Sequence, residues 1–180
     1  NNINYRIPRD CDWDPRAAIR MMYYSRNYLN GSDRGSIDTL FSNKGGTAPL
    51  PNGSMKGGCA SAVKTFIKAG FAQIALDSSR SKEERDKARE RAKNAPELFV
   101  NGWDLHKDNA VREMAKCGFE LKYRTKATTK EGMNKELKEF GLKDGDILTT
   151  LLGDRTDWGH VHMWNSDTQK WVSDGPSQNA

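Results

Sequence analysis

The spacing of apolar residues, together with helix start and stop signals, predicts mainly helices before the last forty residues of the chain. Asp14-Pro15 is typical of a helix start and predicts a helix that runs to Asn30-Gly31. Two shorter helices are expected at 108–117, closed by Gly118, and around 130–140, stopped by Gly141. A longer helix is expected from Cys59 onward, because apolar residues recur there at intervals that place them on one buried face: Val63, Phe66, Ile67, Phe71 and Ile74.

In the last third the apolar period changes to the alternation of a β-strand. Strands are expected in "FELKYRT" (119–125), "DGDILTTLL" (144–152), "WGHVHMWN" (158–165) and "KWVSD" (170–174), joined by polar turns. Helices first and antiparallel strands last predict an α+β fold. A chain of 180 residues is long enough for one hydrophobic core, so a single domain over residues 1–180 is expected.

Two segments are expected to lie outside this core. Residues 31–58 are rich in Gly, Ser, Asn and Pro, which predicts a long loop that forms a wall of a substrate cleft. Residues 80–95 interleave acidic and basic side chains at helical spacing, which favours a solvated helix with ion pairs. A nucleic-acid helix is less well supported, because no zinc-finger spacing, RNA-binding aromatic signature or heptad accompanies the charges.

Net charge and cysteine content narrow the function classes. The net charge of +5 favours an anionic partner, which could be nucleic acid, a membrane surface or an acidic cell-wall polymer. No apolar run reaches the roughly 18 residues of a membrane span, so membrane insertion is not expected. Cys11, Cys59 and Cys117 are odd in number, which predicts at least one free thiol.

Cys59 is the candidate nucleophile, because it lies at a predicted helix start directly behind Gly57 and Gly58. Reactive cysteines need a lowered thiol pKa, which a helix N-terminus and a nearby imidazolium both provide. The two glycines leave room for a carbonyl group to approach the sulfur, and the amide of Cys59 could hold the developing oxyanion. The alternative is that Cys59 is a small buried apolar residue.

Three histidines are available as a general base. His106 lies in a polar stretch and is expected to be a surface or cap residue. His160 and His162 share one strand face with Trp158 and Trp164, a pattern typical of a cleft floor, although a strand can also bury such residues for packing alone. His162 is expected to line the cleft rather than to orient His160, since neighbours along one strand face stand parallel.

Four segments in this order resemble the CHAP and NlpC/P60 group of papain-like peptidoglycan amidases and endopeptidases. They are "GGCASAVKTFIKAGF", "NGWDLHKDNAVREMAKCGFEL", "LKDGDIL" and "WGHVHMW", within residues 57–175. The resemblance implies a papain-like fold with N-terminal helices packed on a C-terminal antiparallel sheet. It implies that Cys59 is the nucleophile, that His160 is the base, and that Gly145-Asp146 opens the preceding strand.

The same resemblance assigns substrate contacts to five residues. Two regions of the chain have no counterpart in the CHAP and NlpC/P60 group. The expected substrate-binding residues are Gly58, Trp103, Trp158, His162 and Trp164. Residues 80–95 are expected to be a helical insertion, and residues 1–56 a helix and loop extension that matches nothing in the group.

A third catalytic residue is expected on the strand after the base, to orient His160 and stabilise its charged form. Asp174 is favoured over Ser173 and Gln178, because a carboxylate stabilises an imidazolium best. For Asp174 to face His160, Trp164 must lie opposite Lys170. A slip of one residue pairs Trp164 with Trp171 instead and turns Asp174 to the other face.

The expected function is therefore a cysteine amidase or peptidase that cuts an amide of bacterial peptidoglycan and needs no cofactor or metal. The chain is expected to act as an antibacterial effector or a phage lysin, secreted or delivered to the periplasm or cell wall. An effector would need a cognate immunity protein that plugs the Cys59 cleft. Binding to nucleic acid is not expected.

Two alternatives from other classes remain. A metal-dependent hydrolase could use His160 and His162, with Asp174, Asp157 or Cys59 completing the site. A non-enzymatic basic binding module would instead depend on the charges of 80–93.

Overall fold

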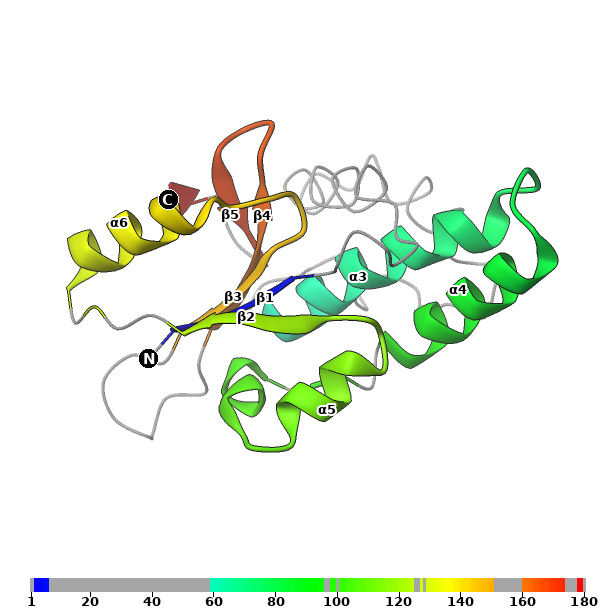
Figure 1. Ribbon diagram of the computed structural model, residues 1–180, viewed down its shortest axis with the longest axis horizontal. Coiled ribbons are helices and arrows are strands. Elements are labelled where there is room, and N and C mark those ends of the chain that lie inside the picture. Colours follow the sequence, from blue (N-terminus) through cyan, green and yellow to red (C-terminus); the bar gives the residue numbers. More distant parts are fainter. Residues whose placement is uncertain are drawn as a thin grey trace, which may run out of the picture.

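The structure is a computed structural model in which a six-stranded sheet is combined with helices (Figure 1). It describes residues 2–6, 59–95, 98–99, 101–124, 127, 129–150, 160–173 and 178–179. The α+β fold class is confirmed at this level. Within these ranges, no helix combines the length and the apolar composition that a membrane crossing requires.

The sheet is antiparallel throughout, with strand order β2-β1-β3-β4-β5-β6. Four of its strands lie where alternation predicted them, whereas β1 was not predicted and inserts the start of the chain between β2 and β3. Residues 2–6 are thus part of the sheet rather than of a peripheral extension. The bounds are β1 Asn2–Arg6, β2 Glu120–Arg124, β3 Ile147–Thr150, β4 His160–Asn165, β5 Lys170–Val172 and β6 Gln178–Asn179.

The helices predicted from Cys59 onward are confirmed within the described residues. Gly118 and Gly141 end their helical segments with φ values of 86° and 81°, a left-handed conformation that glycine adopts without strain. The helix predicted after Asp14-Pro15 and the loop 31–58 lie outside the described residues. The bounds are α3 Cys59–Leu76, α4 Lys82–Asn94, the 3₁₀-helix η4 Gly102–His106, α5 Ala110–Ala115 and α6 Lys130–Phe140.

The main core lies between α3 and one face of the sheet. Helix α3 packs against β4 over its first part and runs beside α4 over its second part (Figure 1), where Ile74 packs on Ala88. Burial of large apolar side chains contributes about 1.5–3 kcal/mol each, so the contact with β4 fixes where the start of α3 lies relative to the sheet. The cluster includes Val63, Phe66 and Ile67 of α3 and Ile147, Val161, Met163 and Val172 of the sheet.

The opposite face of the sheet is covered by α6. Leu137 of this helix packs on Leu148, Trp164 and Trp171, which form a second apolar cluster. Strand alternation explains the division, because Val161 and Met163 point to the α3 side while Trp164 points to the α6 side.

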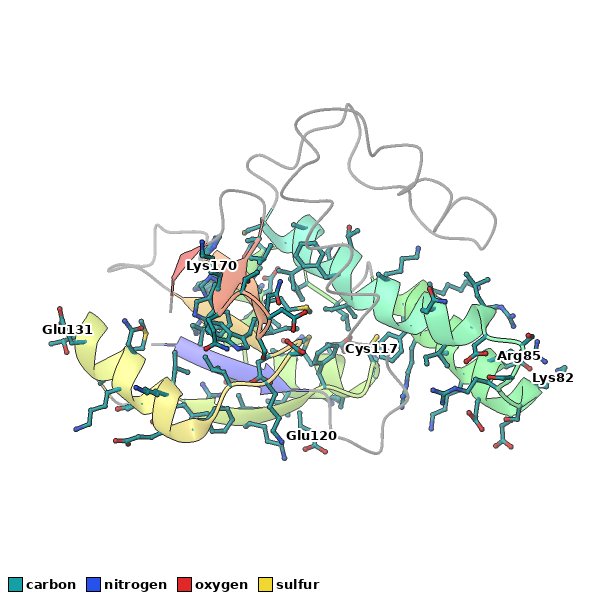
Figure 2. The ribbon with its side chains drawn as sticks, turned by 90° about the horizontal axis from the view of Figure 1, so that it is seen from above. Lys82, Arg85, Cys117, Glu120, Glu131 and Lys170 are labelled. Carbon is teal, nitrogen blue, oxygen red and sulfur yellow. The ribbon has the colours of Figure 1, made fainter. Side chains whose placement is uncertain are left out.

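The charged segment forms a solvated helix, as predicted. Its exposed face carries ion pairs from Asp86 to Lys82 at 2.9 Å and to Arg89 at 2.7 Å, while Ala88 and Ala92 are buried. Figure 2 shows Lys82 and Arg85 at the end of the molecule away from the sheet. Exposed pairs of this kind stabilise a helix by about 0.3–0.5 kcal/mol each.

Candidate active site

Cys59 is the first residue of α3, so its backbone amide belongs to the helix N-terminus. The thiol is not part of a disulfide and is half-buried, and it packs against the main core cluster that contains Val161 of β4. The first turn of α3 contains no acidic residue, so the helix itself places no negative charge beside the sulfur. The position combines partial exposure with the positive end of a helix dipole, which is the setting of a reactive thiol.

His160 is the first residue of β4 and is half-buried. Its ring centroid lies 5.1 Å from that of His162, with the two rings perpendicular. The imidazole is thus on the His162 side of β4, whereas Val161 between them points into the core on which Cys59 packs. In the ladder, His160 pairs with Thr150 of β3.

The backbone of His160 is held closely by Gly102, the first residue of η4. A Cβ atom at Gly102 would lie 2.8 Å from the carbonyl carbon of His160 and 2.9 Å from its nitrogen. Only glycine permits this approach, and it brings the neighbouring Trp103 to the start of β4. Trp103 is half-buried beneath Lys107, whose Nζ is 4.8 Å from the ring centroid.

His162 and Trp164 were expected to line a cleft, but the structure buries both side chains. His162 is 7% exposed and stacks on Trp171 with centroids 4.4 Å apart, and Trp164 is 3% exposed and contacts the same indole. Both ring nitrogens of His162 are buried with no hydrogen-bond partner among the described residues. Burial, and then the charge of His160, lowers its pKa to about 3, so His162 is neutral at neutral pH.

The pairing of β4 with β5 differs from the one that Asp174 required. Trp164 lies opposite Trp171, and Asn165 opposite Lys170, with 166–169 as the turn. The predicted pair of Trp164 with Lys170 is therefore wrong. The aromatic contact explains the outcome, because the rings of Trp164 and Trp171 meet edge to face at 5.0 Å, an arrangement worth about 0.5–1.5 kcal/mol beyond burial.

The three candidates for the residue that orients His160 differ in how the structure describes them. Asp174 lies outside the described residues, as do Gly58 and Trp158. Ser173 is buried, and its Oγ donates a hydrogen bond to the carbonyl oxygen of Val161 at 2.8 Å. Gln178 pairs with Trp171 in the ladder between β5 and β6.

Gly145-Asp146 opens β3, as predicted, and ties it to β4. Gly145 has a φ of 84°, and its amide donates to the carbonyl of Trp164, while the amide of Trp164 donates to the carbonyl of Asp146 at 2.8 Å. The buried carboxylate of Asp146 accepts a hydrogen bond from the amide of Lys143 at 2.9 Å. The Gly145-Asp146 motif therefore has a structural role, because its hydrogen bonds set the register of β3 against β4.

His106 was expected at the surface, but it is half-buried and hydrogen-bonded through Nε2 to Thr149 Oγ1. Burial lowers its pKa to about 4. Thr149 pairs with Val161, so His106 lies on the α3 side of the sheet, the side on which Cys59 packs. His106 is therefore a second candidate base. In the sequence, its spacing of three residues from Trp103 places both side chains on one face of a 3₁₀-helix, and this was the signal that could have indicated its burial.

No arrangement of three or more His, Cys, Asp or Glu side chains suited to a metal ion occurs among the residues that the structure describes. Asp157 and Asp174, which the metal-dependent alternative used, lie outside them.

The chain was compared with known protein families, curated proteins and solved structures. Neither a family model, nor a curated protein, nor a solved structure matches this chain.

Proposed function

We propose that this protein is a cysteine hydrolase that cuts an amide bond of bacterial peptidoglycan, in the manner of the CHAP and NlpC/P60 domains that its motifs resemble. One observation carries the proposal. A helix that begins at a half-buried cysteine outside any disulfide packs against a strand that begins at a histidine. Thiolate catalysis would require the imidazole of His160, which lies on the His162 side of β4, to reach the sulfur of Cys59, which packs on the Val161 side, around the start of the strand.

The reaction would proceed in two balanced steps. The thiolate of Cys59 attacks the scissile carbonyl carbon and forms a thioester, while the imidazolium of His160 gives its proton to the leaving amine. Water, deprotonated by the now neutral His160, then attacks the thioester, which releases the acid and returns the proton to His160. The backbone amide of Cys59 would stabilise the oxyanion in both steps.

The close packing of Gly102 on His160 supports a substrate role for Trp103. Because no side chain separates η4 from the backbone of His160, Trp103 is held at the start of β4, where it could contact a bound peptide. Its half-buried ring lies beneath Lys107, which also pairs with Asp104 at 2.7 Å, so this surface has both apolar and charged character.

The observed register pairs Trp164 with Trp171 and is not the one that Asp174 required, so the proposal does not assign Asp174 as the orienting residue. The hydroxyl of Ser173 is a weak candidate, since it is already donated to the backbone of β4.

The net charge of +5 would favour approach to the carboxylates of stem peptides and to anionic wall polymers. We propose an antibacterial effector or a phage lysin that acts in the periplasm or cell wall. In the first case, a cognate immunity protein would cover the Cys59 cleft.

Digestion of purified sacculi tests the proposal. Mass spectrometry of the products should show one class of newly cleaved amide with the wild-type protein and none with Cys59→Ser. Cys117→Ser is the matched control, because Cys117 is fully buried and its Sγ contacts the carbonyl of Arg91 at 3.5 Å. Equal digestion by Cys59→Ser and the wild type would refute a thiol mechanism.

A further inference from the structure

A cavity of about 350 Å³ lies between α6 and the hairpin of β4 and β5. Trp164, on its wall, is four residues along β4 from His160, a distance of about 13 Å at 3.3 Å per residue. The cavity is thus separate from the candidate active site. It is lined by Asn134, Leu137, Lys138, Leu142, Trp164 and Gln169.

The apolar wall of the cavity is firmly supported. Trp164 is wedged against Trp171, which in turn stacks on His162, so the indole is held from behind by two further rings. Leu137 and Leu142 complete this wall from the side of α6. The volume lies near the lower end of the roughly 300–1,000 Å³ typical of ligand sites, which suits a single compact apolar group.

The polar rim carries a positive charge without a counter-charge. Lys138 is exposed, makes no ion pair with any described residue, and is the charged residue of the lining. Gln169 has a left-handed backbone with a φ of 56°, and its Nε2 donates to the carbonyl of Ser166 at 2.8 Å, so its side-chain oxygen is left to act as an acceptor. A cation beside an apolar wall is complementary to an anion that has an apolar body.

The absence of a carboxylate from the described lining narrows the ligand further. A free amino acid would bring an ammonium group close to Lys138, and the described lining has no carboxylate to offset this like charge. An acylated α-nitrogen carries no charge and could bond to the amides of Asn134 and Gln169.

We propose that this cavity binds the C-terminal residue of a peptide, with its carboxylate on Lys138 and a compact apolar side chain on Trp164. The site does not use Cys59 and goes beyond the proposed hydrolase function.

N-acetyl-leucine is a suitable probe, and N-acetyl-leucinamide and free leucine are its matched controls. In an NMR titration of the full chain, the changes in amide chemical shift on addition of N-acetyl-leucine should reach saturation. They should be confined to α6, residues 142–143 and the 164–171 hairpin. Lys138→Gln should weaken its binding at least fivefold. Lys135→Gln removes an exposed charge of the same helix outside the lining and should leave binding unchanged.

Several results would overturn this assignment: no saturable binding, equal binding of the amide, tighter binding of free leucine, equal weakening by both lysine variants, or shifts elsewhere. Cys59→Ser should bind N-acetyl-leucine as the wild type does. The cavity and the hydrolase proposal can therefore fail separately.

Discussion

The imidazole of His162 stacks on the indole of Trp171, with ring centroids 4.4 Å apart and planes inclined by 18°. The stack places a titratable side chain in an apolar layer, with both nitrogens buried and unpartnered among the described residues. Burial lowers the pKa of His162 to about 3. The layer is therefore stable only while His162 is neutral.

Acid should destabilise the fold through this residue. In the unfolded chain a histidine binds its proton near pH 6.5, whereas native His162 binds it only near pH 3, so unfolding takes up a proton between these values. The free energy of unfolding should fall as the pH falls through this window, by up to about 1.4 kcal/mol per pH unit from this residue. Urea unfolding of the wild type and His162→Phe at several pH values measures the contribution.

His162→Phe keeps the aromatic stack and removes the titration. Its free energy of unfolding should depend less steeply on pH between 6 and 4 than that of the wild type. His106, whose pKa is also lowered, is present in both proteins and cancels in the comparison. Parallel pH profiles would show that His162 does not titrate as the burial implies.

Substitution of the two candidate bases should separate their roles. His160→Ala is expected to lower the rate of sacculus digestion by about 10²- to 10⁴-fold, which is the usual contribution of a general base. His106→Gln keeps a polar group toward Thr149 and should change the rate by no more than a few fold. The opposite ranking would assign the base to His106, on the α3 side of the sheet.

Gly102→Ala should destabilise the protein, because its Cβ would lie 2.8 Å from a backbone atom of His160. The added methyl group would push η4 away from β4, which is expected to lower the free energy of unfolding by about 1–3 kcal/mol. Chemical denaturation of the variant and the wild type measures this difference. Gly132→Ala is the comparison and should cost less, since its Cβ would meet only side-chain atoms, those of Ala127 and Thr129 at 3.0 Å, which need to shift by a few tenths of an ångström. An unchanged stability of Gly102→Ala would contradict the close packing.

Ser173→Ala should affect stability rather than turnover. The variant leaves the buried carbonyl of Val161 without the hydroxyl that it accepts from, which is expected to cost about 1–3 kcal/mol. The rate of digestion per folded molecule should stay near that of the wild type. A loss of rate without a loss of stability would instead make Ser173 the orienting residue.

Local sequence signals predicted much of the fold. The helices Cys59–Leu76 and Lys130–Phe140 follow from apolar spacing, and Gly141 marks the end of the second. Strand β1 escaped prediction because "NINYR" has little apolar alternation and forms a strand only by pairing with segments more than a hundred residues away.

At the site, sequence reasoning predicted the positions of Cys59 and His160 within their elements but not the pairing around them. The register of β4 and β5 depends on a contact between Trp164 and Trp171 across the sheet, and alternation alone allows either register. The half-buried state of His106 depends on Thr149, 43 residues away, which its polar neighbours do not indicate.

The alkylation rate of Cys59 as a function of pH tests the central claim most directly, because it reports on the thiol and the imidazole without any substrate. Iodoacetamide should modify Cys59 rapidly at pH 6, where an ordinary thiol is almost unreactive, and His160→Ala should move the midpoint of the profile to higher pH. His106→Gln should leave the midpoint in place. A wild-type profile like that of an ordinary thiol, or one that His160→Ala does not shift, would contradict the account.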